Sequence, residues 1–264
     1  MRRLGVLLVL LATGASAAAA APPKPALLGI SFPEGFSSRQ MVDRVAAVRR
    51  IAIRTRHVTP RLTAKAYAAA LAKTPAPAAF RPYLHERSLE GFLFPSLYRF
   101  GPADTAAALV GLQLREFAKE WKRVGPITAD ANPYEVLTVA SMVEREAAVA
   151  SERPLVAAVI YNRLAQAIPL GIDATLRYGL GIPGTRPLTK AQLATDSPYN
   201  TRLHTGLPPT PISNPGLPSL RAAARPATTD DLYYVRIPDT VRHYFTADYA
   251  DFCAHVTEYG YGSC

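Results

Sequence analysis

Helical spacing alone singles out one carboxyl group as a candidate for acid-base chemistry. Asn132 suits the N-cap of a helix, and the proline after it suits the first helical position. The apolar spacing of that helix, continued three residues beyond Val143, reaches Glu146, whereas Glu144 and Arg145 fall on other sides. The pattern therefore places one carboxylate on an apolar helix face.

Apolar surroundings raise the pKa of a carboxyl group, so Glu146 is a candidate general acid near neutral pH. The competing interpretation is a structural glutamate at the edge of the core, paired with an arginine such as Arg153 or Arg163. Most glycoside hydrolases use two carboxylates. The only other candidate in a suitable turn is Asp173, so either Asp173 assists or Glu146 works alone with a nucleophile from the sugar.

Other familiar sites are absent from the sequence. It contains no glycine-rich phosphate loop, no G-x-S-x-G elbow, no H-E-x-x-H string and no catalytic-cysteine signature. His243 and His255 flank Cys253, but the spacing is not that of a zinc site, so we expect no metal. In an exported protein, Cys253 and Cys264 are expected to form a disulfide.

A proline-rich loop is the second feature suited to binding. Six prolines lie between Pro198 and Pro218, and they restrict the unfolded chain. The loop begins with Tyr199, Asn200 and Thr201, whose phenol, amide and hydroxyl groups suit sugar recognition. A purely structural loop is the alternative.

The remaining pattern predicts an α+β fold in which helices predominate. A small strand-helix-helix unit comes first, and a β-hairpin, LYYVRI and VRHYFTA around a turn, lies near the C-terminus. The expected elements are a strand at 26–32, a helix that begins after Ser37 or Ser38, a helix at about 61–73, and a helix from Asp104 or Thr105 to about Val124. A further helix begins at Asn132-Pro133 and continues through YEVLTVASMVEREAAVASER; it is followed by a helix from 154, short helices after 173 and 189, and a last helix at 249–256.

The N-terminus and the charge indicate export. Residues 1–21, with Arg2 and Arg3 before an apolar run, predict a signal peptide or a membrane anchor; 22–80 would form the small unit and 81–264 the catalytic domain. The net charge is +10, so we expect attraction to anionic membrane or wall polymers. No dense basic block with interleaved aromatics favours nucleic acid.

Five strings in order, EGFLFPSLYRF, VEREAAVASERPLVAAVIYNRL, SPYNT, GLPPTPISNPG and LYYVRI…HYFTA, resemble the MltG (YceG-like) endolytic murein transglycosylases from about Leu27 to Val256. The resemblance implies a membrane-associated enzyme without metal or cofactor. It would cleave between N-acetylmuramic acid and N-acetylglucosamine in peptidoglycan glycan strands, leave 1,6-anhydro ends and work beside penicillin-binding proteins. It assigns catalysis to Glu146 and substrate binding to Asp173, Thr175, Tyr199, Asn200 and Thr201.

The sequence departs from that family in two places. Ile172 and Ala174 stand where members usually carry glutamine and proline, which puts one sugar contact in doubt. Only about sixty residues precede the catalytic region, where members carry a transmembrane helix and a LysM-like module. A rival hypothesis is a catalytically inactive peptidoglycan-binding protein of the wall-synthesis machinery, which digestion of purified peptidoglycan would distinguish.

Overall fold

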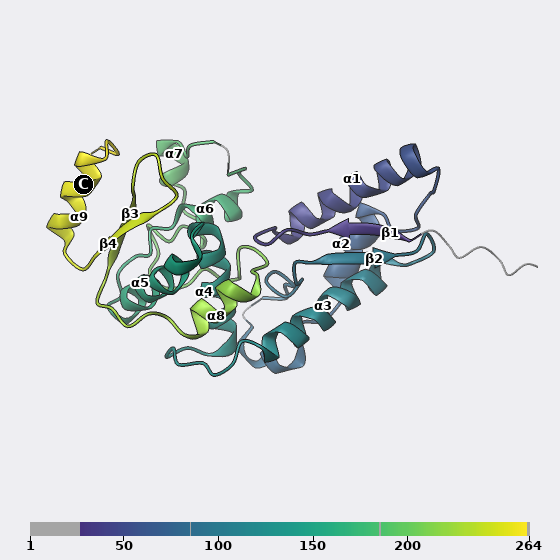
Figure 1. The fold of residues 1–264 in the computed structure, drawn as a ribbon, viewed down its shortest axis with the longest axis horizontal. Coiled ribbons are helices and arrows are strands. Elements are labelled where there is room, and N and C mark those ends of the chain that lie inside the picture. Colours follow the sequence, from purple (N-terminus) through teal and green to yellow (C-terminus); the bar gives the residue numbers. More distant parts are fainter. Residues whose placement is uncertain (1–26, 85, 185, 263–264) are drawn as a thin grey trace, which may run out of the picture.

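The computed structural model describes residues 27–84, 86–184 and 186–262. The predicted signal peptide or anchor at 1–21 lies outside these residues. Within the described part of the chain, no helix is both long enough and apolar enough to cross a membrane. The molecule is elongated, with β1, β2 and α1 to α3 toward one end and α4 to α9, β3 and β4 toward the other (Figure 1).

The first group of elements surrounds a two-stranded antiparallel sheet in which Leu28 pairs with Phe100. The predicted strand and helices of this region are present, and Ser37 caps the first long helix with a capping box. The second strand was not predicted, because its four residues lack a distinguishing pattern. The elements are β1 (Leu28–Ser31), α1 (Ser38–Arg56), α2 (Ala64–Lys73), the 3-10 helix η1 (Ala78–Tyr83), β2 (Leu97–Phe100) and α3 (Ala106–Lys122).

The second group of elements is built around one buried helix, and the predicted C-terminal hairpin is confirmed, with Tyr233 opposite Thr246. The segment between the seventh and eighth helices, 194–216, contains neither helix nor strand. The elements are α4 (Pro133–Glu146), the 3-10 helix η2 (Ala150–Glu152), α5 (Arg153–Ala165), α6 (Asp173–Leu180), α7 (Lys190–Leu193), α8 (Leu217–Ala224), β3 (Tyr233–Arg236), β4 (His243–Thr246) and α9 (Tyr249–Glu258).

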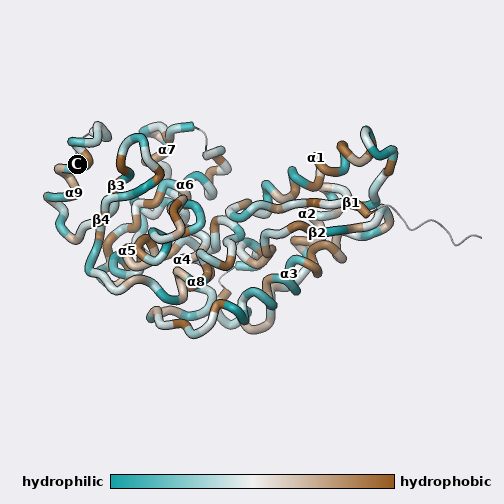
Figure 2. The backbone as a smooth tube through the Cα atoms, in the orientation of Figure 1, coloured by the Kyte–Doolittle hydropathy of each residue, from teal (hydrophilic) through white to brown (hydrophobic). Residues whose placement is uncertain are grey.

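Helix α4 carries the centre of the core. It packs against α8, α5 and α6, and its residues from Val136 to Val143 are buried. Figure 2 shows hydrophobic stretches along α4 and α5, where the two helices meet. Asn132 caps α4 as expected, and the helix ends at Glu146 because Ala147 adopts an extended backbone. The end of a well-packed helix thus holds the predicted acid.

Candidate active site

Glu146 opens onto a cleft of about 590 Å³. The cleft is formed by the end of α4, by α5, by the segments that precede α6 and follow α7, and by β3 and α9. Both carboxylates predicted from the sequence, Glu146 and Asp173, reach it. The other lining residues are Arg163, Ile168, Leu170, Gly171, Ile172, Arg202, Tyr233, Tyr234, Tyr249 and Phe252.

The carboxyl group of Glu146 is held by one phenol. The Tyr234 hydroxyl on β3 donates a hydrogen bond to Glu146 Oε2 at 3.0 Å. Burial raises the pKa of Glu146, although this hydrogen bond opposes the rise. Burial and the nearby Glu146 raise the pKa of Tyr234 well above its ordinary value, so the phenol stays neutral and keeps its proton to donate. Glu146 is thus suited to hold a proton that it can give away.

A histidine and a second glutamate lie behind Tyr234. His243 Nδ1 lies 2.8 Å from Glu152 Oε2, and the His243 amide donates to Glu152 Oε1 at 3.2 Å. The imidazole meets the Tyr234 ring edge to face, with centroids 5.4 Å apart. The pair fixes the side of the hairpin that carries Tyr234.

Neither arginine considered for a structural ion pair makes one with Glu146. Among the described residues, no lysine or arginine forms an ion pair with this carboxylate. Arg163 does line the cleft, but it donates to the carbonyls of Leu232, Pro169 and Leu170 and lies over the Tyr233 ring at 5.0 Å. Arg163 therefore ties β3 to the floor of the cleft and leaves Glu146 free for chemistry.

Asp173, at the start of α6, is held by an arginine from the proline-rich segment. Arg202 Nη2 and Nε donate to Asp173 Oδ1 at 2.6 and 3.1 Å. Both bonds reach the same oxygen, and within the described residues no hydrogen bond reaches Oδ2. Both side chains are more than two-fifths exposed. Arg202 thus holds the Asp173 carboxyl group at the cleft, which both residues line.

Thr175 and Thr201 are buried behind the cleft. Their hydroxyl oxygens lie 3.0 Å apart. Thr201 Oγ1 accepts a hydrogen bond from the Ile172 amide at 3.0 Å, and Thr175 Oγ1 donates one to the Ile172 carbonyl at 2.7 Å. The two threonines thereby fix the backbone immediately before Asp173. Ile172, one of the departures from the family pattern, lines the cleft as an apolar side chain.

Asn200 and Tyr199 also lie away from the cleft. Asn200 is fully buried, and its amide group donates to the carbonyls of Leu193 and Thr195 at 2.9 Å each. The Tyr199 hydroxyl is 2.8 Å from Thr210 Oγ1. These contacts order the proline-rich segment, and direct sugar contact by either residue stays a prediction.

The C-terminal elements form an aromatic wall along the cleft. Tyr233 stacks on Phe252 with centroids 5.2 Å apart and lies 5.4 Å from Tyr249. Partly exposed aromatic rings beside polar groups suit the apolar faces of sugar rings. Neither this wall nor Tyr234, Arg202 and His243 was predicted as part of the site from the sequence. The signal available for them was the density of aromatic residues in LYYV and YADF.

Metal binding has no obvious site in this part of the chain. Among the described residues, no group of three or more histidines, cysteines, aspartates or glutamates is placed to hold an ion. Cys264 lies outside the described residues, so its predicted disulfide with Cys253 on α9 stays a prediction.

Comparison with known proteins supplies an independent view of the same region. The model of the YceG-like family matches residues 7–258. An endolytic murein transglycosylase of Bacillus subtilis is 37% identical over 155 residues, covering 56% of this chain and 41% of that protein. One of Streptococcus pneumoniae is 28% identical over 257 residues, covering 90% of this chain and 46% of that protein.

A solved structure is also similar. The crystal structure of a YceG-like protein from Listeria monocytogenes superposes with a TM-score of 0.70 at 27% identity, covering 85% of this chain and 74% of that one. The chain spans less than half the length of the Bacillus and Streptococcus relatives.

Proposed function

The chain belongs to the YceG-like family, and we propose on that premise that it is an endolytic murein transglycosylase. It cuts peptidoglycan glycan strands between N-acetylmuramic acid and N-acetylglucosamine and leaves 1,6-anhydro-muramyl ends. The observation that carries the proposal is the state of Glu146: a half-buried carboxyl with a raised pKa, bonded to a neutral phenol and facing an open cleft.

The reaction needs one proton and a group that returns it. Protonated Glu146 gives its proton to the glycosidic oxygen as the bond to the muramyl anomeric carbon breaks. The resulting carboxylate then takes the proton of the muramyl carbon-6 hydroxyl, whose oxygen bonds to the same anomeric carbon and closes the anhydro ring. Glu146 ends protonated, and no water is consumed. The Tyr234 hydrogen bond stabilises the carboxylate stage of this cycle.

Asp173 has a supporting part in this scheme. Arg202 holds the Asp173 carboxyl group beside the cleft, where its oxygens can accept a hydrogen bond from a sugar hydroxyl. Thr175 and Thr201 hold the backbone that places it, and Asn200 and Tyr199 order the proline-rich segment that supplies Arg202. The four residues therefore act as positioning residues, and the aromatic wall of Tyr233, Tyr249 and Phe252 carries the sugar rings.

The proposed substrate determines where the protein must act and which molecules it meets there. Peptidoglycan lies outside the cytoplasmic membrane, so the proposed activity requires residues 27–264 to be exported, in keeping with the leader or anchor predicted at 1–21. The basic charge of the chain favours anionic wall or membrane polymers. Contact with penicillin-binding proteins is a further part of the proposal, and it rests on the family resemblance alone.

Digestion of purified glycan strands tests the proposal. Mass spectrometry of the fragments separates anhydro ends from hydrolysed reducing ends, because an anhydro end lacks one water. We expect anhydro ends with the parent protein and a loss of roughly 10²–10⁴-fold in rate for Glu146→Gln. Glu144→Gln is the matched control, since Glu144 accepts a hydrogen bond from the Gly216 amide, away from the cleft. Reducing ends would make the protein a hydrolase, and no cleavage at all would favour an inactive wall-binding protein.

A further inference from the structure

A second pocket of about 290 Å³ lies beside the Glu146 cleft, between α1 and α6. The pocket and the cleft are lined by residues that are adjacent in the sequence. Arg145 lines the pocket and Glu146 lines the cleft; likewise, Ala174 lines the pocket and Asp173 lines the cleft. The end of α4 and the start of α6 therefore form the ridge between them. A ligand that binds at Glu146 and reaches past Arg145 and Ala174 would enter the second pocket.

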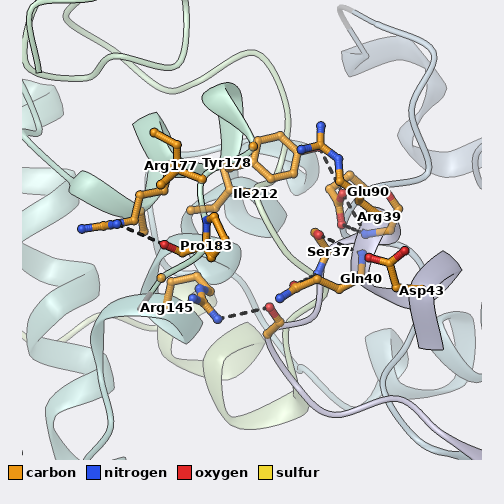
Figure 3. A pocket seen from close by; sticks show the side chains of 16 residues that line it. Ser37, Arg39, Gln40, Asp43, Glu90, Arg145, Arg177, Tyr178, Pro183 and Ile212 are labelled. Carbon is orange, nitrogen blue, oxygen red and sulfur yellow. Dashed lines mark hydrogen bonds between the residues drawn. The ribbon is translucent and has the colours of Figure 1, made fainter. Parts of the chain in front are cut away.

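Three guanidinium groups surround this pocket. Figure 3 shows Arg39 on the side of α1 and Arg145 and Arg177 on the opposite side. Within the described residues, no ion pair joins any of the three to a carboxylate. Their charge is thus available to an anionic ligand lying between them, and the planar fork of arginine fits a carboxylate.

Backbone contacts hold these arginines in place. Arg145 donates to the Gly35 carbonyl at 3.4 Å, and Arg177 donates to the carbonyls of Pro183 and Arg186. The Arg39 guanidinium lies against Gly181, the left-handed residue that ends α6, where a Cβ atom would overlap it. The groups are therefore partly ordered before any ligand arrives, which reduces the entropy lost on binding.

Neither acidic residue of the pocket, Glu90 or Asp43, forms an ion pair with a described arginine. Glu90 is buried, and its two oxygens already accept hydrogen bonds from Ser38, Tyr178 and Asn214. Asp43 is exposed on α1, one turn beyond Arg39, where it suits a ligand amino group. Ala174, Ile182 and Ile212 add apolar surface. The pocket thus matches a short, aliphatic peptide with free carboxylates.

We propose that this pocket binds the carboxylate-bearing stem peptide attached to the muramyl residue that is cut at Glu146. The identity of the ligand rests on the proposed function, because that substrate carries such a peptide on the sugar at the cleavage site. The ridge consists of two pairs of adjacent residues, Arg145–Glu146 on α4 and Asp173–Ala174 on α6. In each pair, one residue lines the sugar cleft and the other lines the peptide pocket. Peptide-bearing strands are therefore preferred over bare strands.

Binding of a small probe tests the pocket without catalysis. Muramyl tripeptide is titrated into three proteins and its binding is followed by NMR: Glu146→Gln, Glu146→Gln with Arg39→Gln, and Glu146→Gln with Arg50→Gln. The same titrations are repeated with a probe whose carboxylates are amidated. Arg50 is an exposed arginine of α1 outside the pocket, so its variant controls for net charge. We expect Arg39→Gln to weaken the acid probe roughly tenfold, the worth of one charge-assisted hydrogen bond, and Arg50→Gln to leave its affinity unchanged.

The outcomes separate this inference from the proposed function. Equal affinity for the acid and amidated probes would refute peptide binding in this pocket, even if the parent protein makes anhydro ends. Equal affinity of the Arg39→Gln and Arg50→Gln proteins for the acid probe would refute it as well. With the active protein, Arg39→Gln should lower the ratio of kcat/KM for peptide-bearing over enzymatically stripped strands by a similar factor. Failure to cleave either strand refutes the proposed function and leaves the binding result to be judged by itself.

Discussion

Replacing Tyr234 by phenylalanine removes one oxygen, the donor that lies 3.0 Å from Glu146 Oε2. Because burial raises the pKa of Tyr234 far above neutrality, the phenol is a donor throughout the working range of pH. Its hydrogen bond favours the carboxylate and so lowers the pKa of Glu146, against the larger effect of burial. Tyr234→Phe therefore weakens the carboxylate state and leaves the protonated state little changed.

The magnitude follows from the kind of bond. A hydrogen bond to a charged group contributes about 1.5–3 kcal/mol, and each 1.36 kcal/mol is a factor of ten in rate. If the bond supports Glu146 at the carboxylate stage, Tyr234→Phe lowers kcat by roughly 10- to 100-fold. The first step needs protonated Glu146, so kcat/KM falls as pH rises through its pKa. Since the variant has a higher pKa at Glu146, that fall moves to higher pH.

The assay is the pH dependence of anhydro-end formation on purified strands, measured for the parent, Tyr234→Phe and Tyr244→Phe. Tyr244 lies on the other strand of the hairpin and donates to Asp251 Oδ2 at 2.9 Å, away from the cleft, so its variant loses the same kind of bond. Only Tyr234→Phe should slow the reaction and shift the profile. A parental profile, or a fall that moves to lower pH, would refute the role assigned to the phenol.

Three further predictions concern stability. Asn200→Ala removes three hydrogen bonds, two donated by its amide nitrogen and one accepted by its oxygen from the Arg202 amide, so urea denaturation should show a loss of roughly 2–4 kcal/mol; parental stability would show that this amide does not order the segment. Burial raises the pKa of Glu90 to about 7, so the folded state holds a proton that the unfolded state releases above its lower pKa. The stability of the parent relative to Glu90→Gln should therefore fall by roughly 3 kcal/mol as pH rises from 5 to 8, and a flat difference contradicts this. A Cys253–Cys264 bridge should add about 2–3 kcal/mol, and two reactive thiols in the unfolded, unreduced protein would exclude it.

Local patterns predicted most of the helices and the C-terminal hairpin, but not β2 or α8, and they predicted the two carboxylates that line the cleft, Glu146 and Asp173. Helical spacing placed Glu146 on the apolar face of α4 because that face is packed by α5 and α8, so the 3.6-residue period determines which side chains turn inward. Capping residues mark helix starts by a hydrogen bond within three residues; Asn132 was identified, and Ser37 and Thr105 were each one of two candidates.

The rest of the site depends on contacts between distant residues. Tyr234 is 88 positions from Glu146, and nothing in either local pattern shows that the hairpin folds back over α4. The motif that begins at Tyr199 was interpreted as a sugar-binding surface from its polar residue types. In the structure Asn200 and Thr201 hydrogen-bond to backbone groups, a use that a single sequence cannot distinguish from sugar binding. Direct sugar contact by these residues stays a prediction.

The most direct test of the central claim, that the sugar is its own nucleophile and Glu146 cycles the proton, is cleavage of purified glycan strands in isotopically heavy-oxygen water. The account predicts anhydro ends that carry no label, formed by the parent protein and not by Glu146→Gln. Labelled reducing ends as the first products would contradict it, because they show that water attacks the anomeric carbon. Undiminished formation of unlabelled anhydro ends by Glu146→Gln would likewise remove this glutamate from the mechanism.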